Sequence, residues 1–218
     1  MRYAPTISTM KIELLKTTPD RAGRYHVQFD DGSVLRLYRQ TVEDFGLYPG
    51  MEFSQEQFEK LTAAGEKLSA KMRAVRIVSA SNVSKSELES RLIQKGEKPA
   101  DAKQAVSWLE ELKLLDDRKT AEQIVQSCIG KGYGLARAKQ VLYEKRIPKE
   151  LWESVLADYP DQTEKITSFL KSRITDPSDQ RAVKRAVDSL LRRGHSYRVI
   201  REALSELSLD SDDFPEDE

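Results

Sequence analysis

Apolar residues recur at helical spacing through most of the chain after residue 54. The stretches 102–112, 121–128 and 183–191 each place apolar side chains three or four positions apart, which is the period that lines one face of an α-helix. Helix-start signals and helix-end glycines such as Gly96 and Gly194 divide this region into predicted helices of about 10 to 17 residues. We therefore predict a mainly α-helical protein.

The first fifty residues have a different pattern. Residues 25–29 alternate apolar and polar, 30–33 are typical of a turn, and 34–38 resume a strand-like composition, so together they predict a β-hairpin. Residues 11–15 are a candidate third strand, and Tyr48-Pro49-Gly50 predicts a closing turn. The sequence Ser54-Gln55-Glu56-Gln57 then has the pattern of a capping box, which begins the helical part.

A degenerate repeat runs through the helical part. The pentads 92–96, 142–146 and 190–194 each contain a leucine, a base three residues later and then a helix stop or near-stop, at intervals of about 50 residues. We predict three units of three helices, while chance alignment of amphipathic helices rich in leucine and alanine is the alternative. The predicted division is a β-rich extension at 1–53, repeats at 54–115, 116–158 and 159–209, and an acidic tail at 210–218.

Charge changes this picture, because the formal net charge of +0 hides a segregation along the chain. Seven bases and one acid lie between residues 181 and 201, and seven acids and no base lie between 206 and 218. The stretch 131–149 adds six bases against one acid, with tyrosines interleaved. This layout fits a surface for a polyanion or for an acidic protein groove, or else an ordinary solvated face followed by a solubilising tail.

Basic side chains of the second and third units are therefore the candidate contacts, since arginine presents a planar fork to phosphates and carboxylates. Tyr133, Tyr143 and Tyr197 could stack on a base or anchor a protein contact. The candidate partner-binding or DNA-binding residues are Lys131, Arg137, Lys139, Lys145, Arg146, Arg181, Lys184, Arg185, Arg192, Arg193, Arg198 and Arg201.

Little in the sequence suggests catalysis. His26 and His195 are the two histidines, and we expect both at solvent positions, one on the polar side of the hairpin and one in a helix–helix turn. Cys128 completes an apolar stripe and is predicted to lie in the core. Residues 130–134 lack the spacing of a phosphate-binding loop, and Asp116-Asp117 is predicted to cap a helix instead of binding a metal. We expect no enzyme activity, no cofactor and no structural metal.

The apolar runs and the cysteine content of the sequence predict where the protein is located. The sequence contains no run of about 18 apolar residues and no apolar core of an export signal near its N-terminus. A single cysteine cannot form an internal disulfide, which favours a reducing compartment. We expect a cytoplasmic monomer with no membrane association.

Several short motifs, taken in order, resemble a known family. Residues 86–96, then Ala105-Val106 and Leu109, then 112–117 and Ala121 resemble the signature of RecX regulatory proteins. The resemblance covers about residues 54–205.

Other parts of the chain extend this resemblance. Gly132-Tyr133-Gly134 followed by 139–142 is similar to the second unit of that family, and the first fifty residues are similar to an extension found in some Gram-positive members. Two positions depart from the family pattern: Thr120 stands where an aromatic residue is usual, and Arg146 stands where a glycine often ends a helix.

The resemblance implies a non-enzymatic modulator of homologous recombination, DNA repair and the SOS response. Such a protein would lie in the helical groove of the RecA filament on single-stranded DNA, where it would restrain ATP hydrolysis, strand exchange and filament growth. Single- or double-stranded DNA is a further candidate contact. The alternative hypothesis is a free-standing DNA- or RNA-binding protein that uses the bases of the second and third units, and an enzyme comes third.

Overall fold

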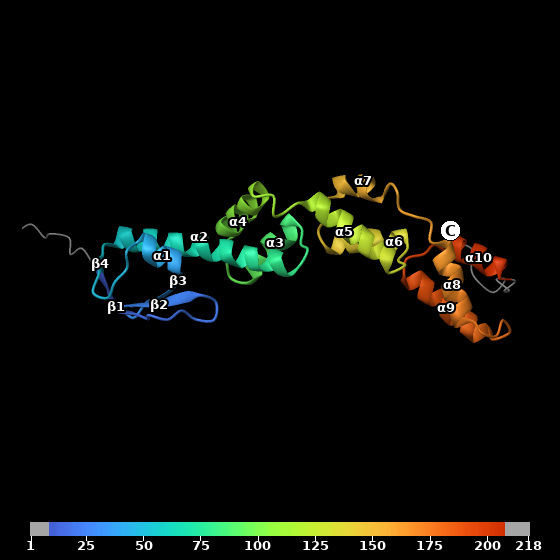
Figure 1. Ribbon diagram of the computed structural model, residues 1–218, viewed down its shortest axis with the longest axis horizontal. Helices are drawn as coiled ribbons and strands as arrows, with labels where there is room; N and C mark the ends of the chain where they lie inside the picture. Colours follow the sequence, from blue (N-terminus) through green and yellow to red (C-terminus); the bar gives the residue numbers. More distant parts are fainter. Residues whose placement is uncertain (1–8, 208–218) are drawn as a thin grey trace, which may run out of the picture. The chain divides into compact units, whose positions relative to one another are not determined.

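The computed structural model describes residues 9–207 and is mainly helical (Figure 1). The chain divides into two compact units, Met1–Leu115 and Asp116–Glu218, and each is described by itself. The predicted acidic tail at 210–218 lies outside the described residues. No helix within 9–207 is long and apolar enough to cross a membrane.

A small antiparallel sheet opens the first unit. Its strands are β1 (Met10–Leu15), β2 (Arg24–Phe29), β3 (Val34–Tyr38) and β4 (Glu52–Phe53), in the spatial order β3-β2-β1-β4. The predicted hairpin and third strand are therefore confirmed. Neither β4 nor the short helix α1 (Arg39–Asp44) was predicted, because elements of two and six residues are too short for a periodic pattern to reveal.

Helix α2 (Gln55–Ala80) begins at the predicted capping box. The backbone N–H of Gln57 donates to the Ser54 hydroxyl, and the Ser54 N–H donates to the Gln57 side chain. At 26 residues the helix is longer than any predicted helix, so the predicted lengths were wrong here. Gly65 does not end it: a Cβ at this position would lie 2.5 Å from Leu37 Cδ2, so the glycine gives β3 room to pack on the helix.

Two separate cores lie along α2. The sheet packs on its first half, where Phe29, Phe53 and Leu61 are buried together. On the second half, α3 (Lys85–Gln94) and α4 (Pro99–Glu111) cover a second buried cluster (Figure 1). The Ser84 hydroxyl accepts the Glu87 N–H and so caps the start of α3.

The second unit is helical throughout its described part. Its helices are α5 (Asp117–Gly130), α6 (Leu135–Glu144), α7 (Trp152–Leu156) after a 3₁₀ turn at Lys149–Leu151, α8 (Thr163–Arg173), α9 (Gln180–Arg192) and α10 (Tyr197–Glu206). Asp116 caps α5 and Cys128 lies in the core, as predicted. One apolar cluster joins α5, α6 and α7, and another joins α8, α9 and α10. That these groups are repeats of one unit stays a prediction.

Residues in the left-handed backbone conformation end several helices. Gly96 and Gly194 have φ of 91° and 81°, which confirms both predicted stops. Arg146, at the position where the resembled family often has glycine, has φ of 52°. The Ile147 N–H donates back to the Leu142 carbonyl at 3.0 Å, which is the hydrogen bond of a glycine-type helix end. The arginine therefore adopts a backbone conformation that glycine adopts at lower cost.

Candidate partner-binding surface

Two glycines bring α6 against the turn between α9 and α10. The Gly134 N–H donates to the Arg193 carbonyl at 2.9 Å. A Cβ on Gly134 would overlap the Gly194 carbonyl and lie 2.6 Å from the His195 nitrogen, and a Cβ on Gly194 would lie 2.6 Å from Arg137 Cβ. These backbones touch because neither residue has a side chain. We call this contact the glycine junction.

His195 is buried in the glycine junction with 8% of its surface exposed, so the predicted solvent position was wrong. Its Nε2 lies 3.0 Å from the Gly132 carbonyl oxygen. Burial lowers the pKa of His195, and this effect outweighs the hydrogen bond to Gly132, which raises it. His26, in β2, is half-buried.

Two further hydrogen bonds link the segment before α6 to the segment after α7. The Tyr159 hydroxyl donates to the Tyr133 carbonyl at 2.6 Å, and Lys165 Nζ donates to the Ile129 carbonyl at 2.7 Å. Burial raises the pKa of Tyr159 to about 12, so the hydroxyl remains a donor at neutral pH. The end of α5 and the α5–α6 connector are thus bonded to α8 and to the loop after α7, respectively.

Helices α8 and α9 form a groove with a cavity volume of about 460 Å³. We call it the arginine groove, and its lining residues are Phe169, Arg173, Ala182, Arg185, Ala186, Ser189 and Arg192. Three of these are arginines and none is acidic, while the small side chains of α9 leave the space open. The guanidinium carbons of Arg173 and Arg193 lie 5.6 and 4.7 Å from the centre of the Phe169 ring, within the range of a cation–π interaction.

Of the candidate residues, the groove brings together Arg185 and Arg192, with Arg193 next to it on Phe169. Arg173 was not predicted, because it lies outside the dense run of bases between residues 181 and 201. The spacing of Phe169 and Arg173, four residues apart on one face of a helix, was the available signal. Recognising it also required knowing that this face packs beside α9.

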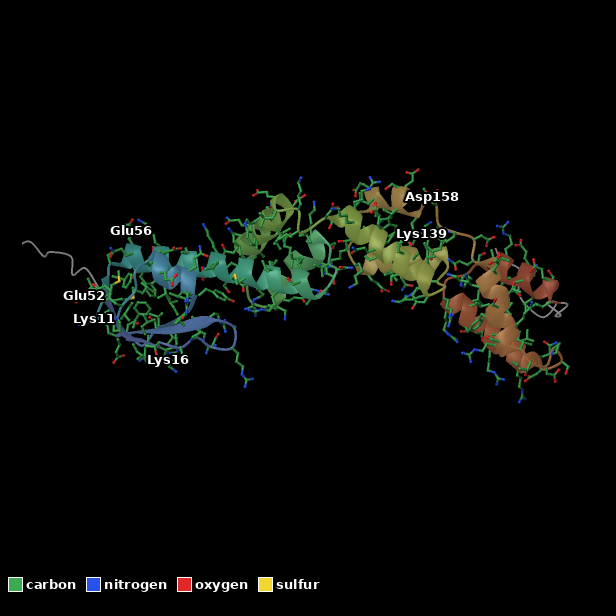
Figure 2. All side chains as sticks on the ribbon, in the orientation of Figure 1. Lys11, Lys16, Glu52, Glu56, Lys139 and Asp158 are labelled. Atoms are coloured by element: carbon green, nitrogen blue, oxygen red, sulfur yellow. The ribbon has the colours of Figure 1, made fainter. Side chains whose placement is uncertain are left out.

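Candidates on α6 and around it are not gathered into one site. Lys131 Nζ lies 6.0 Å from the centre of the Tyr133 ring, and an Arg137 nitrogen lies 3.4 Å from a Glu144 carboxylate oxygen. Lys139, labelled on α6 in Figure 2, lines a different cavity. Lys145 and Arg146 follow the last residue of α6.

The remaining candidates lie on other faces of α9 and α10. Arg181, Lys184 and Arg198 are exposed and line neither cavity. The guanidinium carbon of Arg201 lies 5.1 Å from the centre of the Tyr197 ring. Tyr197 is buried, so the suggestion that it stacks on a base was wrong, because the ring belongs to the α8–α10 core.

No group of three or more histidine, cysteine, aspartate and glutamate side chains within residues 9–207 could hold a metal ion.

The fold and the arginine groove place the chain in the class of helical proteins that present basic surfaces.

Comparison with known proteins identifies the family. No family model matches the chain. Regulatory protein RecX of Vibrio parahaemolyticus is 30% identical over 141 residues, which is 63% of this chain and 91% of the relative. Regulatory protein RecX of Clostridioides difficile is 23% identical over 203 residues, which is 90% of this chain and 94% of the relative. The chain belongs to the RecX family of regulatory proteins.

Solved structures share the fold. A crystal structure of regulatory protein RecX has a TM-score of 0.59 at 20% identity, covering 88% of this chain and 99% of the other. The crystal structure of RecX from Lactobacillus salivarius has a TM-score of 0.58 at 24% identity, covering 67% of this chain and 99% of the other.

Proposed function

We propose that this protein binds the RecA nucleoprotein filament and inhibits its ATPase, strand-exchange and filament-extension activities. Membership in the RecX family supports a regulatory role, and the resemblance of its motifs supports RecA as the partner. The observation that carries a binding role is the arginine groove, held at a fixed position relative to α6 by the glycine junction. The protein acts as a cytoplasmic monomer without a cofactor.

The groove suits an anionic surface. Arginine can donate two parallel hydrogen bonds to one carboxylate or phosphate, and Arg173, Arg185 and Arg192 surround one cavity. Arg185 lies 3.9 Å from its nearest acidic partner, Asp179, so the internal ion pair is weak. Because these side chains are exposed, each contact contributes little alone and several must act together.

Charge reversal tests this function. Arg192→Glu with Arg193→Glu should weaken inhibition of the DNA-dependent RecA ATPase about tenfold, since two exposed charge contacts of up to about 1 kcal/mol each together contribute roughly 1.4 kcal/mol. Far-ultraviolet circular dichroism should show unchanged helical content. The control with the same net charge is Lys103→Glu with Lys119→Glu, two exposed bases on α4 and α5. Equal inhibition by the two double variants would remove the arginine groove from the mechanism.

A free-standing nucleic-acid-binding protein is the second candidate, because the groove is lined by no acid and contains the Phe169 ring. Binding to single-stranded DNA alone, measured by fluorescence anisotropy over a range of salt concentrations, separates the two functions. A protein that neutralises Z phosphates on a single strand shows a slope of about −0.7Z in log affinity against log salt. Tight, steeply salt-dependent binding without RecA, together with an unaffected RecA ATPase, would favour this second candidate.

A further inference from the structure

One face of the antiparallel sheet in the first unit is exposed. Helices α1 and α2 pack on the opposite face, where Val27, Phe29 and Leu37 are buried (Figure 1). Side chains alternate between the two faces of a strand, so the residues between these belong to the exposed face. Leu14 and Val34, two apolar residues of that face, are 42% and 45% exposed. We call it the open sheet face.

Three basic side chains form one row across the open sheet face. The register pairs His26 of β2 with Arg36 of β3. Lys16, labelled in Figure 2, follows β1, and its N–H donates to the His26 carbonyl at 3.0 Å. Because neighbouring strands lie about 4.8 Å apart, the backbones of Lys16 and Arg36 are about 10 Å apart, with His26 between them. All three side chains line a pocket of about 340 Å³, and we call them the basic row.

The charges of Lys16 and Arg36 are not neutralised within the fold. Neither side chain forms an ion pair with any residue in 9–207. The acid that lines the pocket is Asp20, and its Oδ2 accepts hydrogen bonds from Arg24 Nε and Nη2 at 3.1 and 2.9 Å. Its Oδ1 accepts the backbone N–H groups of Ala22 and Arg24 at 2.8 and 3.0 Å. Asp20 therefore neutralises Arg24, and two cations of the pocket have no counter-charge.

Apolar side chains flank the basic row on both sides. The row before it contains Leu14 and Val34, with Gln28 between them. The Gln28 amide donates to a second acid of this face, Glu13, at 3.0 Å, so this acid is engaged outside the basic row. On the other side lies the half-buried ring of Tyr38, two residues after the arginine of the row on the same strand.

This arrangement matches a single-stranded nucleic acid. A single strand has anionic phosphates along its backbone and bases whose apolar faces are accessible. In a duplex the base faces are stacked on one another, so the apolar side chains of the sheet would have no partner there. A cationic row between apolar side chains therefore fits the single strand better than the duplex.

We propose that the open sheet face binds single-stranded nucleic acid, with a backbone phosphate in the pocket between Lys16 and Arg36. Arginine can donate two parallel hydrogen bonds to a phosphate, and lysine supplies a compact positive charge. The bases lie against Leu14, Val34 and Tyr38 on either side of the basic row. These contacts are to phosphate and to base faces, so binding should depend little on base sequence.

This inference goes beyond the proposed function, because the open sheet face belongs to the first unit and the arginine groove to the second. It is tested without RecA. Loss of the sheet contact with intact inhibition of RecA would overturn this inference alone.

Fluorescence anisotropy of a labelled oligothymidylate, titrated with the full chain over a range of salt concentrations, is the first test. Each phosphate neutralised on a single strand contributes about 0.7 to the slope of log affinity against log salt. Lys16→Gln with Arg36→Gln should therefore lower the slope by about 1.4 and weaken binding about tenfold at low salt.

A matched control removes the same two residue types from the first unit. Arg76→Gln with Lys103→Gln changes one arginine and one lysine at exposed positions of α2 and α4. It should leave the slope and the affinity close to those of the parent. Equal slopes and equal affinities in the two double variants would overturn the proposal.

NMR on the full chain locates the contact. Oligothymidylate should shift the methyl signals of Leu14 and Val34 and the side-chain signal of Arg36. A blunt DNA duplex and an oligoglutamate, each at matched charge, should shift them less. Equal or larger shifts with either competitor would assign the face to a different partner and would overturn the proposal. Shifts confined to the arginine groove would place the single strand on the second unit and would overturn it as well.

Discussion

Gly134→Ala tests the glycine junction, because alanine can adopt the backbone conformation that Gly134 has in the fold. Gly134 has φ of −73° and ψ of 166°, a conformation that alanine adopts freely. The new Cβ would overlap the Gly194 carbonyl and lie 2.6 Å from the His195 nitrogen. All of these are backbone atoms, so no side chain can rotate away and the two segments must separate.

The cost follows from these contacts. Overpacking a close contact costs about 1–3 kcal/mol. Separation would also weaken the hydrogen bond from Gly134 to Arg193, which contributes about 0.5–1.5 kcal/mol. We expect a total loss of about 2–4 kcal/mol in the free energy of unfolding.

Gly130→Ala is the matched control. Gly130 is the last residue of α5, and a Cβ there would meet nothing within 4 Å. Replacing a helical glycine by alanine removes backbone entropy from the unfolded chain and should stabilise the second unit by up to about 1 kcal/mol. The two glycine variants should therefore shift stability in opposite directions.

Urea unfolding followed by tryptophan fluorescence measures this difference. Trp108 lies in the first unit and Trp152 in the second, so a Trp108→Phe background makes the signal specific for the second unit. The midpoint should fall for Gly134→Ala and stay level or rise for Gly130→Ala. If Gly134→Ala unfolds within about 0.5 kcal/mol of its parent, the range typical of neutral surface changes, the contact is not as tight as described.

Two further substitutions extend these tests. Arg146→Gly relieves a left-handed backbone conformation at φ of 52° and should raise the free energy of unfolding of the second unit by about 0.5–1 kcal/mol, seen as a higher urea midpoint. A lowered midpoint would show that the arginine side chain stabilises the helix end. Because burial lowers the pKa of His195 below its usual 6.5, the unfolded chain binds a proton that the folded chain excludes, so stability should fall as the pH drops below about 6.5 and stay unaffected by this group above it. His195→Gln should flatten that dependence in unfolding measured from pH 8 to 5, and an equal slope in the variant would exclude His195 as its source.

Local signals in the sequence predicted most of the elements correctly. The capping pattern at Ser54, the acids at 116–117 and the glycine at 96 each act within one helical turn, so their effect does not depend on the rest of the fold. The hairpin at 24–38 was equally local. Gly65 lies inside a helix, and its lack of a side chain is explained only by packing against Leu37 of a distant strand. Local sequence signals do not reveal such a contact.

The candidate surface was less predictable, because it depends on contacts between segments that are distant in the sequence. Arg185 and Arg192 were chosen for their charge, but their grouping with Arg173 depends on the packing of α8 beside α9. His195 was expected in solvent because a residue after a helix-end glycine normally lies there. Its burial comes from the Gly132 connector, which is distant in sequence and which no periodic pattern links to it.

The glycine junction and the arginine groove share one end of α9, where a change of side chain and a shift of backbone should have different effects. Arg192 is the last residue of the helix and lines the groove. The Arg193 guanidinium lies over the Phe169 ring, and the Arg193 carbonyl accepts the Gly134 N–H. A charge reversal at these positions changes the side chains and keeps the backbone contact, so it should alter binding with little loss of stability. A side chain at Gly134 moves the backbone that carries both arginines, so stability and binding should decline together. The glycine junction therefore belongs to the binding surface through the backbone geometry that it fixes, although its glycines present no charge.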